Sequence, residues 1–144
     1  PTHYKYERWH LGPYPPEMKK AVKNKKFFGA DGNELKVVDE KSLFKYNNPY
    51  EQQVIDGIGE LAQLFGQYVP KERPHQTELL ATVCKVIEDI QSTDLAAVRQ
   101  SMKEWKIDLK NTKVKNKAEK FNEDETRECL NLITKNKWQE RLIT

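Results

Sequence analysis

The chain has 144 residues, which is enough for one domain with a hydrophobic core and too few for two domains of ordinary size. Its 25 basic and 22 acidic residues leave a formal net charge of +3, and no apolar run approaches the roughly 18 residues that a membrane-spanning helix needs. The first residues contain no apolar segment typical of a secretory signal. Pro1 is compatible with a native start or with a cleaved presequence.

The first sixteen residues combine prolines with large apolar side chains and sustain neither a helical nor a strand period. Prolines favour extended backbone and stop a helix, and a disordered tail is normally poor in aromatic residues. We therefore predict that residues 1–16 form an extended arm that lies against a surface. That surface is either the rest of the chain or a partner protein. The anchors on a partner would be Tyr4, Tyr6, Trp9, Leu11 and Tyr14.

Residues 16–28 have the composition of a short helix with a basic face. Pro16 suits the first helical position, and Glu17 suits the first turn, where the helix dipole favours negative charge. The lysines of this segment are Lys19, Lys20, Lys23, Lys25 and Lys26, with no acidic residue among them. Such a run is usually a solvated helix face, and the alternative is a patch that binds a negatively charged partner.

A short β-hairpin is predicted near residues 27–38. Asp31, Gly32 and Asn33 belong to the residue types that accept positive φ, and apolar residues flank them on both sides. Residues 39–48 are expected to connect this hairpin to the next helix.

Two long segments have the apolar spacing of helices with one buried face. The first covers residues 49–69, with Pro49 near its start and Pro70 just after its end. The second covers residues 75–90, and we expect it to be the central helix of the fold. Its predicted buried residues are Leu79, Leu80, Val83, Cys84, Val86, Ile87 and Ile90.

Another helix is predicted over residues 95–105, after a cluster of good capping residues at 92–94. Leu95, Val98, Met102 and Trp105 recur at the spacing of a packed seam. Because only a short break separates this helix from the central one, the two are expected to form an antiparallel helical hairpin.

The segment at about 106–121 is predicted to be an exposed, lysine-rich linker. It contains Lys106, Lys110, Lys113, Lys115, Lys117 and Lys120 but only two acidic residues. The last helix is expected to begin at Asn122, because Glu125 stands at the position that completes a capping box. Its end carries Trp138, Leu142 and Ile143, which either pack on the core or meet a partner.

The sequence contains none of the compact motifs that indicate catalysis. There is no glycine-rich phosphate loop, no Cys-x-x-Cys, no His-Glu-x-x-His and no nucleophile elbow. The three histidines, His3, His10 and His75, are too scattered to indicate a metal site. We therefore expect no catalytic residue, no metal, no cofactor and no small-molecule substrate. Cys84 and Cys129 are interpreted as buried thiols in a reducing compartment, with a disulfide or a metal pair as the alternative.

These patterns predict a mainly α-helical protein. We expect a small helical bundle over residues 17–144, built on the central hairpin with flanking helices, and an arm over residues 1–16. The leading functional hypothesis is a non-catalytic interaction or assembly subunit of a larger intracellular complex, in the cytoplasm or on the mitochondrial matrix side. Its partner-binding residues would be the arm aromatics together with Trp138, Leu142 and Ile143.

The alternative hypothesis is a lysine-rich nucleic-acid-binding protein. Backbone contacts would come from the lysines at 19–26 and from Lys110, Lys113, Lys115 and Lys117, and nearby aromatic residues would stack on bases. Lysine alone gives point-charge attraction without the bidentate recognition that arginine provides, and the net charge is small. A membrane-surface role through residues 19–28 is weaker still, because the apolar face there is thin.

Overall fold

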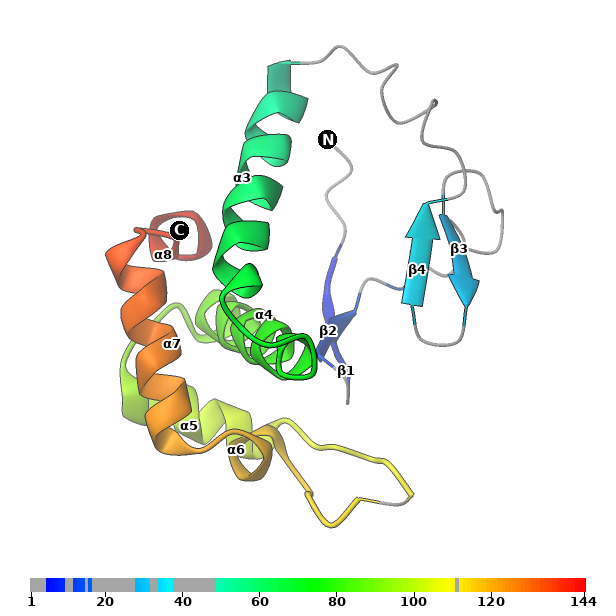
Figure 1. Ribbon diagram of the computed structural model, residues 1–144. Coiled ribbons are helices and arrows are strands. Elements are labelled where there is room, and N and C mark those ends of the chain that lie inside the picture. Colours follow the sequence, from blue (N-terminus) through cyan, green and yellow to red (C-terminus); the bar gives the residue numbers. More distant parts are fainter. Residues whose placement is uncertain are drawn as a thin grey trace. The chain divides into compact units, whose positions relative to one another are not determined.

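The computed structural model of the protein describes residues 5–9, 12–14, 16, 28–31, 34–37, 49–110 and 112–144. These residues are mainly helical, with two small antiparallel pairs of strands (Figure 1). The predicted mainly α fold class is therefore confirmed. The chain divides into two compact units, Pro1–Lys5 with Pro15–Pro70, and Tyr6–Tyr14 with Lys71–Thr144. Residues 6–14 thus group with the C-terminal helices. The lysine-rich helix predicted over 16–28 lies almost entirely outside the described residues.

The first unit contains the predicted hairpin and one long helix. Strand β3, Phe28–Asp31, pairs with strand β4, Glu34–Val37, and the pairing closes at Asp31 and Glu34. This confirms the hairpin and the position of its turn. Helix α3, Pro49–Gly66, begins at the proline that was expected near its start. Its residue Leu61 is exposed, whereas Leu64 and Phe65 are half-buried.

The second unit is built around helix α4, Arg73–Ile90. Its buried side chains are Leu79, Leu80, Thr82, Val83, Val86 and Ile87. The predicted apolar stripe is therefore confirmed as a core, although Cys84 and Ile90 are only half-buried. Helix α4 packs against helix α5, Leu95–Glu104, helix α7, Glu123–Lys135, and helix α8, Gln139–Leu142. Among the described residues, no helix is long and apolar enough to cross a membrane.

The starts of α5 and α7 follow local capping signals. The side chain of Asp94 accepts a hydrogen bond from the backbone N–H of Ala97 at the start of α5. At the start of α7 the Asn122 side chain accepts from the backbone N–H of Glu125, at 2.9 Å, and the Glu125 carboxylate accepts from the N–H of Asn122, at 2.8 Å. The predicted capping box is confirmed.

Replacing Asn122 by alanine is expected to lower the free energy of unfolding by about 1 kcal/mol, because an orphan N–H at the start of α7 loses its acceptor. The matched control is Asn131→Ala on an exposed position in the middle of the same helix, where alanine has the better helix propensity. Urea unfolding measures both. Equal losses for the two variants would mean that the cap contributes nothing.

The prediction of an exposed linker at 106–121 is wrong at its C-terminal end. Residues Lys117–Lys120 form helix α6, and Ala118 and Phe121 are buried. Lys117 is itself fully buried, with 0% of its surface exposed. Helix α6 packs against α5. The lysine-rich composition concealed a short apolar contact, because Ala118 and Phe121 are three residues apart and share one side of a helical turn.

The N-terminal segment forms a second hairpin. Strand β1, Glu7–Trp9, pairs antiparallel with strand β2, Gly12–Tyr14, and β2 packs against α4. Gly12 has a φ of +130°, a conformation that side chains with a Cβ rarely adopt, and a Cβ there would lie 3.8 Å from Cγ of Glu78. Of the two surfaces considered for the arm, strands β1 and β2 therefore lie on the chain's own helices.

Candidate partner-binding site

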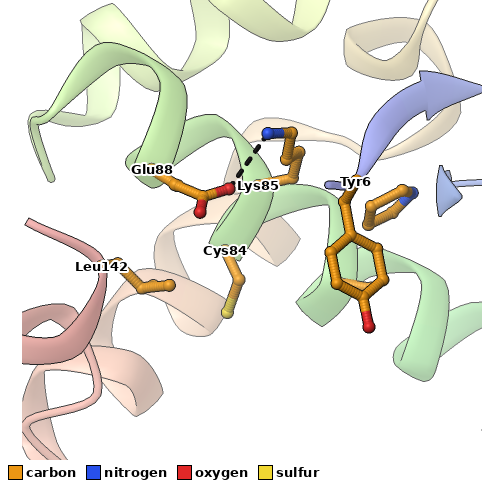
Figure 2. Close-up of a pocket in the computed structure, with 7 residues that line it drawn as sticks. Tyr6, Cys84, Lys85, Glu88 and Leu142 are labelled. Atoms are coloured by element: carbon orange, nitrogen blue, oxygen red, sulfur yellow. Dashed lines mark hydrogen bonds and ion pairs between the residues drawn. The ribbon is translucent and has the colours of Figure 1, made fainter. Parts of the chain in front are cut away.

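A pocket lies between the N-terminal hairpin, α4 and α8 (Figure 2). It has a volume of about 280 Å³ and is lined by Tyr6, Pro13, Ala81, Cys84, Lys85, Glu88 and Leu142. Most of its surface is apolar. Figure 2 shows Tyr6 and Leu142 on opposite sides of Cys84. Side chains from both ends of the chain thus line the same hollow on α4, and we call it the Tyr6–Leu142 pocket.

The wall that carries Tyr6 is fixed by Arg8. The Arg8 Nε donates to Asp89 Oδ2 at 2.7 Å, and its Nη2 donates to the Ser101 hydroxyl at 2.7 Å. The guanidinium also lies over the Trp105 ring, 5.3 Å from the centroid, which is cation–π geometry. The Trp105 indole N–H in turn donates to the backbone carbonyl of Trp9 at 2.8 Å. These contacts join β1 to both α4 and the end of α5.

The polar edge of the pocket is an ion-pair network on α4. Lys85 contacts Glu88 at 3.0 Å and Asp89 at 2.8 Å, and Asp89 also accepts from Arg8. Burial would lower the pKa of Lys85, but the hydrogen bonds to Asp89 and Glu88 outweigh it and raise this pKa. Burial likewise opposes ionisation of Asp89, yet hydrogen bonds from Lys85 and Arg8 keep its pKa below the usual value. Lys85 and Asp89 therefore both stay charged at neutral pH.

The opposite wall is held by Gln91. This residue ends α4 with a φ of 54°, and its side-chain amide donates to the backbone carbonyl of Leu142 at 2.9 Å. Its amide oxygen accepts from the N–H of Thr144 at 2.8 Å. Leu142 is thereby placed beside α4. No local sequence pattern indicates this contact, because Gln91 and Leu142 are 51 residues apart.

Cys84 lies on the floor of the pocket between the two walls. Burial raises the pKa of its thiol to about 11, so the thiol is protonated at neutral pH. A protonated thiol is a weak nucleophile and a weak metal ligand. Cys129 is buried on α7, and both cysteines are free thiols. Of the two thiols that were interpreted as buried, Cys129 is buried and Cys84 is half-buried.

The predicted partner-binding residues fall into three groups. Tyr6 and Leu142 line the pocket. Trp9 is 42% exposed on β1, and Trp138 and Ile143 are half-buried beside α8. Tyr4 and Leu11 lie outside the described residues, and of Tyr14 only the backbone is described, in β2.

The predicted basic patch does not form one surface from the residues described. Lys110, Lys113 and Lys115 are exposed, but Lys117 is buried against Glu78 at 2.5 Å. Lys120 contacts the same carboxylate at 2.7 Å. Lys19, Lys20, Lys23, Lys25 and Lys26 lie outside the described residues. The lysine-rich pattern predicts a solvent-exposed Lys117. Its partner Glu78 is 39 residues away, so no local pattern indicates the contact.

Potential metal ligands do not gather in the described part of the chain, where no group of three or more His, Cys, Asp and Glu side chains could hold an ion. His75 is paired with Glu125 at 2.8 Å, and its ring is tilted against that of Phe121, with ring centroids 4.9 Å apart. In comparisons with known protein families, curated proteins and solved structures, nothing matches this chain.

Proposed function

We propose that the protein is a non-catalytic interaction or assembly subunit of a larger intracellular protein complex. In this proposal the Tyr6–Leu142 pocket receives an apolar side chain of a partner protein. The observation that carries it is the convergence of Tyr6 and Leu142 on one hollow of α4. Both are candidate partner-binding residues from sequence alone, and they come from opposite ends of the chain.

The size and lining of the pocket suit an anchor side chain. Pockets for drug-sized ligands have volumes of about 300–1,000 Å³, and this one is smaller, at about 280 Å³. An apolar floor with a charged pair at its edge is the usual composition of an interface hot spot, in which one buried anchor is surrounded by polar contacts. Tyr6, 47% exposed, offers the partner further apolar area beside the pocket.

The surrounding helices suit the role of a rigid frame. We infer a small bundle in which α4 and α5 form an antiparallel hairpin, supported by the packing of α4 against α5, α7 and α8. The pocket walls are attached to this frame by Arg8 and Gln91. A preformed site of this kind binds with little loss of conformational entropy.

A non-catalytic role is supported by the chemistry of the pocket lining. Its Cys84 thiol is protonated at neutral pH because burial raises its pKa to about 11. Its Lys85 ammonium group forms ion pairs with two carboxylates, those of Glu88 and Asp89. Neither group is prepared for nucleophilic attack or for proton transfer.

Filling the pocket is expected to abolish partner capture. Ala81→Leu places a larger side chain in the hollow while keeping a good helix former in α4. The matched control is Ala96→Leu, the same substitution on an exposed position of α5. Affinity capture of each tagged variant from its own cells, after nuclease treatment, measures which proteins are recovered. We expect the wild type and Ala96→Leu to recover the same partner proteins. The amount of these proteins recovered by Ala81→Leu is expected to be at least tenfold lower.

The thermal midpoint of each variant is measured alongside. Loss of the same proteins by both variants, or undiminished recovery by Ala81→Leu with an unchanged thermal midpoint, would contradict the proposal. Recovery that collapses after nuclease treatment of the wild type would favour the nucleic-acid hypothesis instead.

A further inference from the structure

The chain between helices α5 and α6 forms a loop with a fixed base. Lys106 and Asn116 form an antiparallel bridge. Behind the bridge the N–H of Lys117 donates to the carbonyl of Trp105 at 3.1 Å. Trp105 and Lys117 are both buried, so the core holds the base of the loop. We call residues 106–116 the lysine loop; Figure 1 shows it, in yellow, extending beyond the helices between α5 and α6.

The tip of the lysine loop presents an apolar side chain to solvent. The N–H of Thr112 donates to the carbonyl of Leu109 at 3.3 Å, which closes a turn at the point where the chain reverses. Leu109 begins this turn and is 40% exposed. Nearer the base, Ile107 and Val114 are half-buried. The most exposed apolar side chain of the loop therefore lies at its tip.

The charge of the lysine loop is strongly one-sided. Its four exposed lysines are Lys106, Lys110, Lys113 and Lys115. Asp108 is its single acidic residue, so the loop has a net charge of +3. Among the described residues none of the four ammonium groups takes part in a salt bridge. Because one of these lysines directly follows Leu109 in the tip turn, exposed apolar surface and positive charge are adjacent there.

The acidic side chain of Glu119, at the start of the next helix, is engaged at the base of the loop. Its carboxylate accepts the backbone N–H of Lys115 at 2.8 Å and the side-chain amide of Asn116 at 2.8 Å. These two bonds add to the bridge in fixing the base. They also leave the ammonium groups of the loop facing solvent, because Glu119 bonds to amides and to none of the lysine side chains of the loop.

We propose that the lysine loop docks on the surface of a membrane that contains anionic lipids. Leu109 enters the boundary between headgroups and acyl chains, and the lysines face the anionic headgroups. Buried apolar area and basic charge both strengthen binding to such a surface. Because the core fixes the base of the loop, docking of the tip costs little conformational entropy. The loop shares no residue with the Tyr6–Leu142 pocket, so the proposal does not rest on the pocket's function.

Two features of the loop favour a membrane over a nucleic acid. It contains no aromatic side chain for stacking on a base and no arginine for bidentate contacts. An exposed leucine gains nothing from a phosphate backbone, whereas insertion below the headgroups removes its apolar surface from water. Lysine attracts anionic headgroups as a point charge without a fixed geometry, which suits a fluid surface.

Binding to vesicles tests the role of the lysines. The full chain is titrated with unilamellar vesicles of phosphatidylcholine alone and of an equal mixture with phosphatidylserine, and bound protein is separated by flotation. We expect binding to the mixed vesicles only, and we expect added salt to weaken it because exposed charges are screened. The loop variant combines Lys110→Gln, Lys113→Gln and Lys115→Gln. Its partition coefficient is expected to be at least tenfold lower, since each lysine near an anionic surface contributes about fivefold.

A charge-matched control separates the loop from the overall charge of the protein. It combines Lys135→Gln, Lys137→Gln and Arg141→Gln, which removes three exposed charges near the end of α7 and from α8. The partition coefficient of this control is expected to change little.

Leu109→Gln tests the insertion of the tip. Glutamine has a similar length but removes the apolar surface, so the partition coefficient is expected to fall about fivefold or more. The matched control is Leu61→Gln, the same substitution at an exposed position of α3, which is expected to leave vesicle binding unchanged. The thermal midpoint of each variant is measured alongside to show that the chain is folded.

Absence of binding to the mixed vesicles would overturn the proposal, as would equal effects of the lysine variant and its control. Undiminished binding of Leu109→Gln would also overturn it, because attraction by lysines alone would then explain the binding. Lysine-dependent binding to a fluorescein-labelled uridine oligonucleotide, with no binding to vesicles, would assign the loop to nucleic acid instead.

Discussion

Glu78→Gln is expected to lower the free energy of unfolding by about 3–5 kcal/mol. Lys117 is completely buried, and the Glu78 carboxylate lies 2.5 Å from its ammonium group. The Lys117 ammonium also lies 5.4 Å from the Trp105 ring centroid, which adds weaker electrostatic stabilisation. Glutamine keeps the shape of the glutamate side chain but removes the negative charge that faces the buried ammonium group. Less of the cost of desolvating that ammonium group is then offset.

Two variants provide controls in urea unfolding. Lys120→Gln removes the partly exposed partner of the same carboxylate and is expected to cost about 1 kcal/mol or less. Lys117→Met removes the buried charge itself and leaves Glu78 with Lys120, so its cost is expected to be well below that of Glu78→Gln. A loss for Glu78→Gln no larger than that for Lys120→Gln would show that the buried pair is not needed.

The effect of Glu78→Gln also has a predicted pH dependence. Burial lowers the pKa of Lys117 below its usual 10.5, and the hydrogen bond and charge of Glu78 oppose that shift. Without Glu78 the pKa of Lys117 falls further. Between this lowered pKa and 10.5 the unfolded chain binds more protons than the folded chain, so stability rises with pH. The deficit of the variant is therefore expected to shrink as the pH rises toward 10.5.

Features that depend on neighbouring residues were predictable from the sequence. The capping box of Asn122 and Glu125 needs only a spacing of three residues, and the hairpin turn needs only residues that accept positive φ. The core face of α4 was predictable because helical periodicity alone sorts its side chains. In each case the physical cause lies in residues that are close together in the sequence.

Features that depend on distant residues were not predictable in the same way. Arg8 meets Asp89 across 81 positions, and Glu78 meets Lys117 across 39. Taken singly, each of these charges matches the pattern of a solvated surface, and only the fold brings them together. The aromatic content of residues 1–16 indicated contact with a surface, but no local rule chooses between the chain's own helices and a partner. The Tyr6–Leu142 pocket is unpredictable for the same reason, since its walls come from opposite ends of the chain.

The two thiols are expected to lower the free energy of unfolding steeply as the pH rises above 9. Burial raises the pKa of Cys84 from 9.0 to about 11 and that of Cys129 from 9.0 to about 12, and charge on Cys84 adds to the shift of Cys129. Below pH 9 both thiols are neutral in the folded and the unfolded chain. Above pH 9 the unfolded thiols ionise first and release protons, so each lowers the free energy of unfolding by about 1.4 kcal/mol per pH unit.

By pH 11 this amounts to about 2–3 kcal/mol for each thiol, which is a large part of the stability of a small domain. The test compares the wild type with the double variant Cys84→Ala and Cys129→Ala, by urea unfolding under reducing conditions between pH 7.5 and pH 11. The variant is expected to be less stable at pH 7.5, because alanine leaves space in the core. Its stability is expected to depend less on pH, so the deficit closes above pH 9. Tyrosines and lysines titrate alike in both proteins and cancel in the difference. Parallel pH profiles would mean that the folded chain lets these thiols ionise as readily as the unfolded chain does.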